Sequence, residues 1–161
     1  TLFRSYSPDM DPRVKQAIVK NISIALDVHA QLEEEIFYPA LVEAGVSADI
    51  AGKNVPEHDE IRLLTMDLKT LEPTGESYDG TVMQLMRETL HHVADEESTL
   101  LPEAERVLGS SRLMTIGLRM TRRRLELLGS HAGELVGNAA QLAGSPLLLA
   151  GQSLRRSMFG R

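Results

Sequence analysis

Apolar residues recur every three or four positions along most of this chain, which is the spacing of a helix that buries one face. The first such stretch begins near Pro12, a residue that suits the first turn of a helix, and ends before Gly45. Its predicted buried face includes a histidine and a glutamate among the apolar side chains. The residues on that face are Ile18, Ile22, Ala25, His29, Leu32, Glu33, Ile36 and Ala40.

Helical spacing also marks residues 47–71, 78–108 and 111–140, and no stretch shows a convincing strand pattern. Pro56 is expected to start or kink the second helix, and Gly109 to stop the third. The fourth stretch contains four glycines, which weaken its continuity as a helix. We expect residues 144–161 to form a short helix or a loose tail. We therefore predict an all-α fold, an up-down four-helix bundle with a C-terminal helix and tail.

One phrase occurs twice on the predicted buried faces: His, three residues, Glu-Glu, four residues, Pro. The copies begin at His29 and His92. A His and a Glu four residues apart share one helix face, and a buried carboxylate there needs a partner or a metal. Four-helix bundles build carboxylate-bridged dimetal sites from such facing pairs. With a third imidazole between the two copies, the candidate ligands are His29, Glu33, His58, His92 and Glu96.

Composition limits the chemistry of such a site. The chain has 161 residues, 42% apolar and 25% charged, enough for one soluble domain with a core. It has no cysteine, so a metal must be held by imidazole and carboxylate, donors that suit iron or zinc. No apolar run approaches the roughly 20 residues of a membrane span, and no signal peptide is visible, so we expect a cytoplasmic protein.

Charge divides the chain near Gly109. The formal net charge is −6, but residues 1–108 carry −12 (9 basic against 21 acidic) and residues 109–161 carry +6 (8 against 2). We expect a metal-binding bundle core over 1–108 and a C-terminal helix with a basic tail over 109–161 that packs back on the acidic part. Because aromatic residues make up only 4%, the arginines of 119–124 are interpreted as a solvated or salt-bridged face, with no nucleic-acid partner.

The segments 29–39, 57–58 and 91–97 (HAQLEEEIFYP, EH and HHVADEE) resemble the hemerythrin-like, HHE cation-binding family. The resemblance covers about residues 1–108. It implies two iron ions, with His29, His58 and His92 as ligands and with Glu33 and Glu96 as bridging carboxylates. It also implies that the small molecule handled is a diatomic ligand or peroxide.

Two departures from the family pattern carry consequences. The family places another ligand histidine on the first bundle helix, whereas this chain has none before His29. Thr1–Ser7 looks like the last turn of that helix, so we expect a truncated first helix, whose groove is filled by a homodimer partner or by the chain's own C-terminal helix. Oxygen carriers of the family have a second histidine four residues after the position of His58. Here that residue is Arg62, which argues against reversible oxygen carriage.

The sequence leaves several readings open. The function is binding, sensing or peroxide decomposition at a diiron site, with catalase-like or nitric oxide-related turnover undecided. The alternatives are an iron-storage or sensor module without turnover and a metal-free helical interaction bundle. His91 is expected in solvent or behind the ligands, His131 on the surface, and Tyr38 in the core, where it could also donate a hydrogen bond to a bound ligand.

Overall fold

The computed structural model describes residues 2–143, and every regular element within them is helical, as predicted. In chain order the elements are a 3-10 helix η1 (Leu2–Ser5), α1 (Pro12–Leu32), a π-helical turn η2 (Glu33–Phe37), α2 (Tyr38–Glu43), α3 (Ala48–Ala51), α4 (Val55–Thr70), α5 (Glu76–Asp95), a second π-helical turn η3 (Glu96–Leu100), α6 (Leu101–Ser130) and α7 (Ala132–Ala143).

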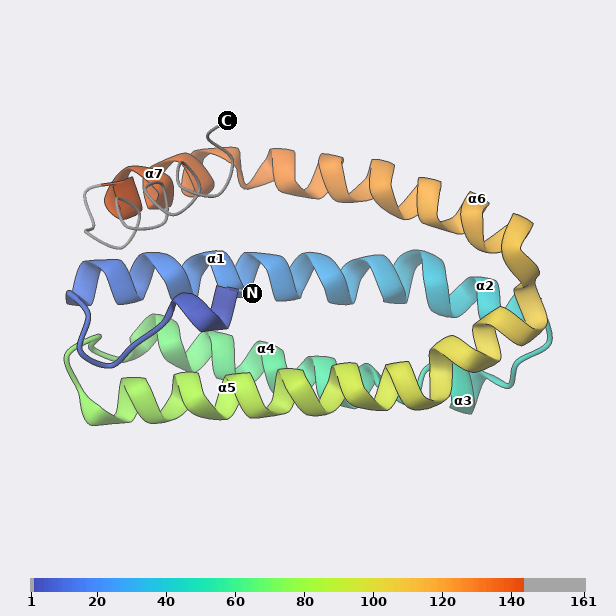
Figure 1. Cartoon of the computed structure of the whole chain (residues 1–161), viewed down its shortest axis with the longest axis horizontal. Helices are drawn as coiled ribbons and strands as arrows, with labels where there is room; N and C mark the ends of the chain where they lie inside the picture. The colour runs from blue at the N-terminus through green and yellow to red at the C-terminus, as the bar shows by residue number, and fades with distance from the viewer. Residues whose placement is uncertain (1, 144–161) are drawn as a thin grey trace, which may run out of the picture.

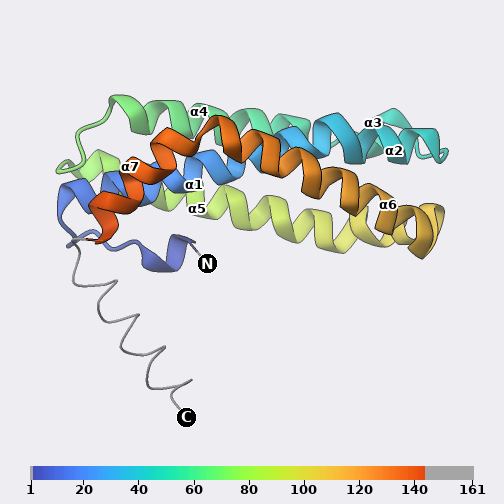
Figure 2. The same cartoon turned by 90° about the horizontal axis from the view of Figure 1, so that it is seen from above.

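These elements form an up-down bundle around α1. The segments α1, η2 and α2 make one long rod, and α5, η3 and the first turns of α6 make another (Figure 1). Helices α4 and α5 are an antiparallel pair on one side of α1, while the rest of α6 and α7 run back along the other side (Figures 1 and 2). Among the described residues, no helix is both long and apolar enough to cross a membrane.

Two apolar clusters hold the bundle together. One packs the first half of α1 against α4 and the start of α5, and its most buried members include Ile22, Val82 and Leu85. The other packs the end of α1 with η2 and α2 against η3 and α6, around residues such as Leu41 and Leu100. The predicted metal-binding side chains of α4 and α5 lie where these helices pass from one cluster towards the other.

The C-terminal helices cover part of α1, as expected for a groove filled by the chain itself. Asn138 of α7 donates a hydrogen bond of 2.8 Å to Asn21 of α1. Arg123 of α6 pairs with Glu35 of η2 at 2.8 Å. The basic part thus packs on the acidic part within the described residues. The expected tail over 144–161 lies outside them.

Three details of the predicted helices are wrong. Residues 47–71 are not one helix, because the chain turns at 52–54 between α3 and α4, although Pro56 does stand in the first turn of α4, as predicted. Ala25 is exposed rather than buried, since it faces the space between α1 and α6. Leu125, which the helical spacing of 111–140 also places on the buried face, is 68% exposed, and Leu127 is the buried residue of that turn. The same spacing is right for Ile116 and Leu128, which belong to or pack against the core cluster.

Both glycines predicted to stop a helix adopt positive φ. Gly45 has φ 94° after α2, and Gly109 has φ 66° where α6 bends and the chain reverses towards α1. An L side chain is strained in this left-handed region, whereas glycine is not. Because the space around the missing Gly109 side chain is open, the cost of a substitution there arises from the backbone alone.

We therefore expect Gly109→Ala to lower the free energy of unfolding by about 1 kcal/mol, measured by urea denaturation. Gly117→Ala is the matched control, because Gly117 lies in the helical part of α6 and also has open space around it. That substitution is expected to raise stability by roughly 0.5–1 kcal/mol. A shift of the same sign for both variants would contradict the requirement for a left-handed residue at 109.

Candidate metal centre

In each copy of the repeated phrase, a π-helical turn begins at the first glutamate. The amide of Tyr38 donates to the carbonyl of Glu33, and the amide of Leu101 donates to the carbonyl of Glu96, five residues apart in each case. The prolines that end the phrase, Pro39 and Pro102, explain this, because proline has no N–H and its ring crowds the carbonyl four residues earlier. A wider turn lets the helix continue through the proline. The sequence analysis missed these turns, although the repeated proline was their signal.

The five predicted ligand side chains converge from three rods of the bundle. His29 and Glu33 come from α1 and η2, His58 from α4, and His92 and Glu96 from α5 and η3. The Nε2 atom of His92 lies 3.2 Å from Nε2 of His29 and 3.3 Å from Nε2 of His58. The Oε2 atom of Glu33 lies 3.3 Å from Nε2 of His29 and 3.2 Å from Nε2 of His58. The Oε2 atom of Glu96 lies 3.5 Å from Nε2 of His92 and 3.9 Å from Nε2 of His29.

This spacing suits a metal ion. One donor atom from each of His29, Glu33, His58 and His92 falls within 4.8 Å of the other three. The separations given by the ion pairs and ring contacts among these donors run from 3.2 to 3.9 Å. Donors at such distances surround a point roughly 2 Å from each, which is the length of an imidazole or carboxylate bond to a transition metal. The donor set therefore fits a metal ion such as iron or zinc. The assignment of the five residues as ligands remains a prediction.

Burial makes the carboxylates costly without a cation. Glu33 and Glu96 are each 6% exposed, and among the described residues neither forms an ion pair with Lys or Arg. Burial, followed by the nearby Glu33 charge, raises the pKa of Glu96 to about 7. Burial also lowers the pKa of His29, which favours the neutral imidazole that binds metals. A bound cation would remove the conflict between the two carboxylates.

Outer carboxylates fix two of the imidazole rings. The Nδ1 atom of His58 lies 2.8 Å from Oε1 of Glu34, and the Nδ1 atom of His92 lies 2.9 Å from Oε2 of Glu57. An ionised carboxylate only accepts, so each Nδ1 donates its proton, and in the neutral ring Nε2 keeps a lone pair for a metal. Burial lowers the pKa of His58, but in the metal-free protein the hydrogen bonds that its ring donates to Glu33 and Glu34 outweigh burial, and the net shift is upward.

Tyr38 links the two central carboxylates. Its hydroxyl lies 3.2 Å from Oε2 of Glu33 and 3.2 Å from Oε1 of Glu96. Burial, together with these two negative charges, raises the pKa of the Tyr38 phenol, so it stays a protonated donor. The side chain is 5% exposed and belongs to the core, as predicted, while its hydroxyl faces the site.

Other predicted residues lie elsewhere. The imidazole of His91 is 73% exposed, and that of His131 pairs with Glu134 near the junction of α6 and α7. Of the acidic residues beside the ligands in the sequence, Glu34 lies behind His58, whereas Asp95 pairs with Lys53 at 2.7 Å. The acceptor for His92 is Glu57, which the sequence analysis did not single out, because no spacing rule connects residues 35 positions apart on different helices.

Comparisons with known proteins agree with this geometry. The family model of the hemerythrin HHE cation binding domain matches residues 2–104. A protein named DNA nickase from Nostoc sp. (strain PCC 7120 / SAG 25.82 / UTEX 2576) is 29% identical over 109 residues, which cover 68% of this chain and 31% of that relative. No solved structure matches. The chain belongs to the hemerythrin HHE cation-binding family.

Proposed function

We propose that this protein holds a carboxylate-bridged pair of iron ions and handles dioxygen, peroxide or nitric oxide there. The observation that carries the proposal is the convergence of three imidazoles on the buried pair Glu33 and Glu96. Each carboxylate has two oxygens and can bridge two cations, while each imidazole occupies one position on one cation. Iron bound in this way would supply redox chemistry and an open coordination position for the small molecule.

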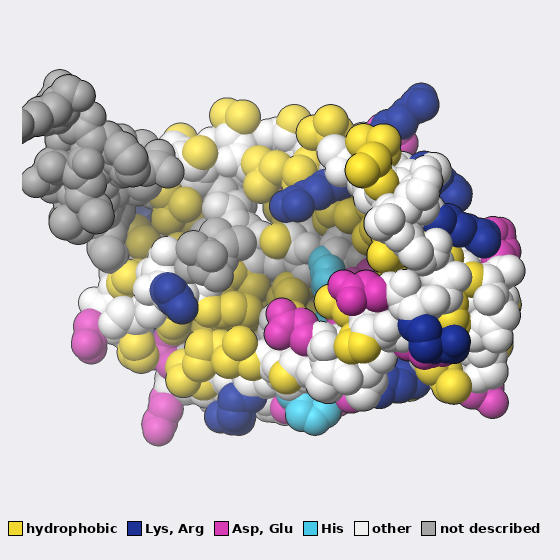
Figure 3. Space-filling model, turned by 45° about the vertical axis from the view of Figure 1, so that its right-hand side comes forward, with side chains coloured by type: hydrophobic (Ala, Val, Ile, Leu, Met, Phe, Trp, Pro, Cys, Tyr) yellow, Lys and Arg dark blue, Asp and Glu magenta, His cyan; other side chains and the backbone are white. Residues whose placement is uncertain are grey.

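The surrounding side chains support this role. The Tyr38 hydroxyl lies within hydrogen-bonding distance of one oxygen of each central carboxylate and can donate its single proton to either. The Glu34 and Glu57 carboxylates accept from the His58 and His92 rings. His29 differs from the other two histidines, since its side chain is 38% exposed. It borders a groove of about 420 Å³ between α1 and the α6–α7 segment. Figure 3 shows one face of the molecule, on which a histidine side chain is recessed among apolar and acidic side chains. We infer that small molecules reach the centre along this groove.

Reaction or sensing fits the site better than reversible oxygen carriage. At the position where the oxygen carriers of the family have a further histidine, the guanidinium of Arg62 points to Glu34 and Asp59. Peroxide decomposition and nitric oxide chemistry are the turnover reactions we propose. An iron-storage or sensor module would instead bind iron and consume neither peroxide nor nitric oxide. A metal-free bundle would have a stability that chelators leave unchanged.

Removing the central carboxylates should abolish iron binding. We expect Glu33→Gln/Glu96→Gln to fold and to lose its iron, because amides do not bridge cations as carboxylates do. Elemental analysis after anaerobic loading measures the iron content. Glu35→Gln is the matched control, since Glu35 lies on the same π-turn but pairs with Arg123. A full iron complement in the double variant would refute the proposed centre.

The metal-free protein should lose stability as the pH rises. The pKa of Glu96 is raised in the folded state from 4.5 to about 7, so the folded protein binds a proton more tightly than the unfolded chain does. The contribution of Glu96 to the free energy of unfolding is therefore complete below pH 4.5 and decreases up to pH 7. Denaturation at a series of pH values should show this decrease in the wild type and a smaller one in Glu96→Gln. Equal slopes would argue against a shared proton at this pair.

A second candidate function is cleavage of one DNA strand, suggested by the name of the Nostoc relative, DNA nickase, and by exposed arginines on α6. Arg119, Arg122 and Arg124 are exposed there. The match spans 31% of that relative, and the buried site admits small molecules more readily than a duplex. We expect supercoiled plasmid to remain intact with iron-, manganese- or zinc-loaded protein. Nicking that disappears in Glu33→Gln/Glu96→Gln would establish the second candidate instead.

A further inference from the structure

We propose that Arg62 is a positioning residue of the metal centre: through Glu34 it fixes the ring of His58. This inference rests on the proposed metal centre. The contact that motivates it is a shared atom, because Oε1 of Glu34 lies 2.8 Å from Nδ1 of His58 and 2.9 Å from Nη2 of Arg62. The guanidinium and the imidazole therefore donate to the same carboxylate oxygen.

Glu34 needs this second partner to hold its position. The Glu34 side chain is 29% exposed, whereas the His58 side chain is 1% exposed, so water competes for the carboxylate but not for the ring. A glutamate at the surface has several rotamers of similar energy, and a charge-assisted hydrogen bond selects one of them. With Glu34 fixed, the proton of His58 stays on Nδ1, and Nε2 faces Glu33 and His92.

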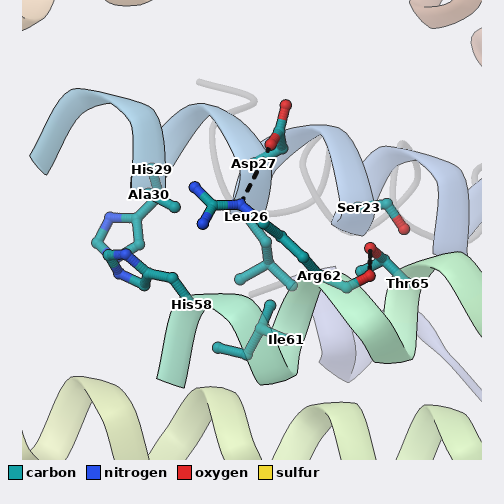
Figure 4. A pocket seen from close by; sticks show the side chains of 9 residues that line it. All are labelled: Ser23, Leu26, Asp27, His29, Ala30, His58, Ile61, Arg62 and Thr65. Atoms are coloured by element: carbon teal, nitrogen blue, oxygen red, sulfur yellow. Dashed lines mark hydrogen bonds and ion pairs between the residues drawn. The ribbon is translucent and has the colours of Figure 1, made fainter. Parts of the chain in front are cut away.

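Arg62 is itself held at several points. Its Nη1 lies 3.0 Å from Oδ1 of Asp59, one turn earlier on α4, and its Nε lies 3.9 Å from Oδ1 of Asp27 on α1. Figure 4 shows the guanidinium extended from α4 towards α1, on the same side as the rings of His29 and His58. Three carboxylates from α1, η2 and α4 thus surround one cation.

The same guanidinium lines a small pocket that reaches the proposed ligands. The pocket lies between α1 and α4, and its walls include His29, Ala30, His58, Ile61 and Arg62. Its volume is about 10 Å³, room for about one water molecule. Arg62 therefore also limits the access of water to the His58 ring from this side.

The neighbouring residue supplies a built-in comparison. Glu35 follows Glu34 on η2 and likewise pairs with an arginine from another helix, with Nε of Arg123 2.8 Å from its Oε2. The carboxylate of Glu35 contacts no histidine among the described residues. The two Arg–Glu pairs on this π-turn thus differ in one respect. The glutamate paired with Arg62 also contacts a proposed ligand, His58, and the glutamate paired with Arg123 does not.

The test uses zinc-loaded protein, because zinc takes the same donor atoms and is diamagnetic. With ¹⁵N-labelled histidine, NMR measures how fast the Nδ1 proton of His58 exchanges with water. We expect Arg62→Gln to raise this rate by about tenfold, Arg62→Lys to raise it less because the charge remains, and Arg123→Gln to leave it unchanged. The rate of zinc release to a chelator should rise in the same order, by about tenfold for Arg62→Gln.

A double-mutant cycle shows whether Arg62 acts through Glu34. In a Glu34→Gln background, Arg62→Gln should change neither rate further. Additive effects, or equal rates in Arg62→Gln and Arg123→Gln, would overturn the inference. If Arg62→Gln fails to fold, the comparison of Arg62→Lys with Arg123→Lys decides in the same way. A wild-type protein that binds neither zinc nor iron would instead overturn the proposed function.

Discussion

The structure depends on placing two negative charges inside a helical bundle. Glu33 and Glu96 are almost completely buried, and within residues 2–143 the basic side chains within ion-pair distance of them are histidines. Burying an ionised carboxylate without a cation costs free energy. The surrounding side chains therefore either donate protons to the pair or bind a metal ion together with it. The position of Tyr38 between the carboxylates and the raised pKa of Glu96 are both consequences of this constraint. The apolar clusters on either side exclude water and keep the cost high.

The fold class and the central residues were accessible from the sequence because each leaves a local signal. Apolar residues at helical spacing, with Gly45 and Gly109 as stops, identify the long helices. The repeated His/Glu phrase identifies four of the five central side chains, and His58 lies between its two copies in the sequence. The structure brings all five together, while their role as ligands awaits measurement of the bound metal.

What the sequence could not show depends on contacts between distant segments. Glu57 reaches His92 across two helices, and no periodicity within one helix predicts such a contact. Leu125 and Leu127 are both apolar, so the pattern alone did not decide which of them α6 would bury against α1. The π-turns were missed for a different reason. Their signal, a proline five residues after the second glutamate, is local, but it is also compatible with a simple kink.

Because the chain reverses at Gly109, the contacts on the two sides of α1 differ greatly in sequence separation. Helices α4 and α5 are neighbours in sequence, so their pairing closes a short loop. By contrast, the hydrogen bond between Asn21 and Asn138 joins residues 117 positions apart. Closing so long a loop costs more chain entropy and slows the contact. We therefore expect the α6–α7 segment to dock after α1, α4 and α5 have paired, so that His29 faces open water until its groove is formed.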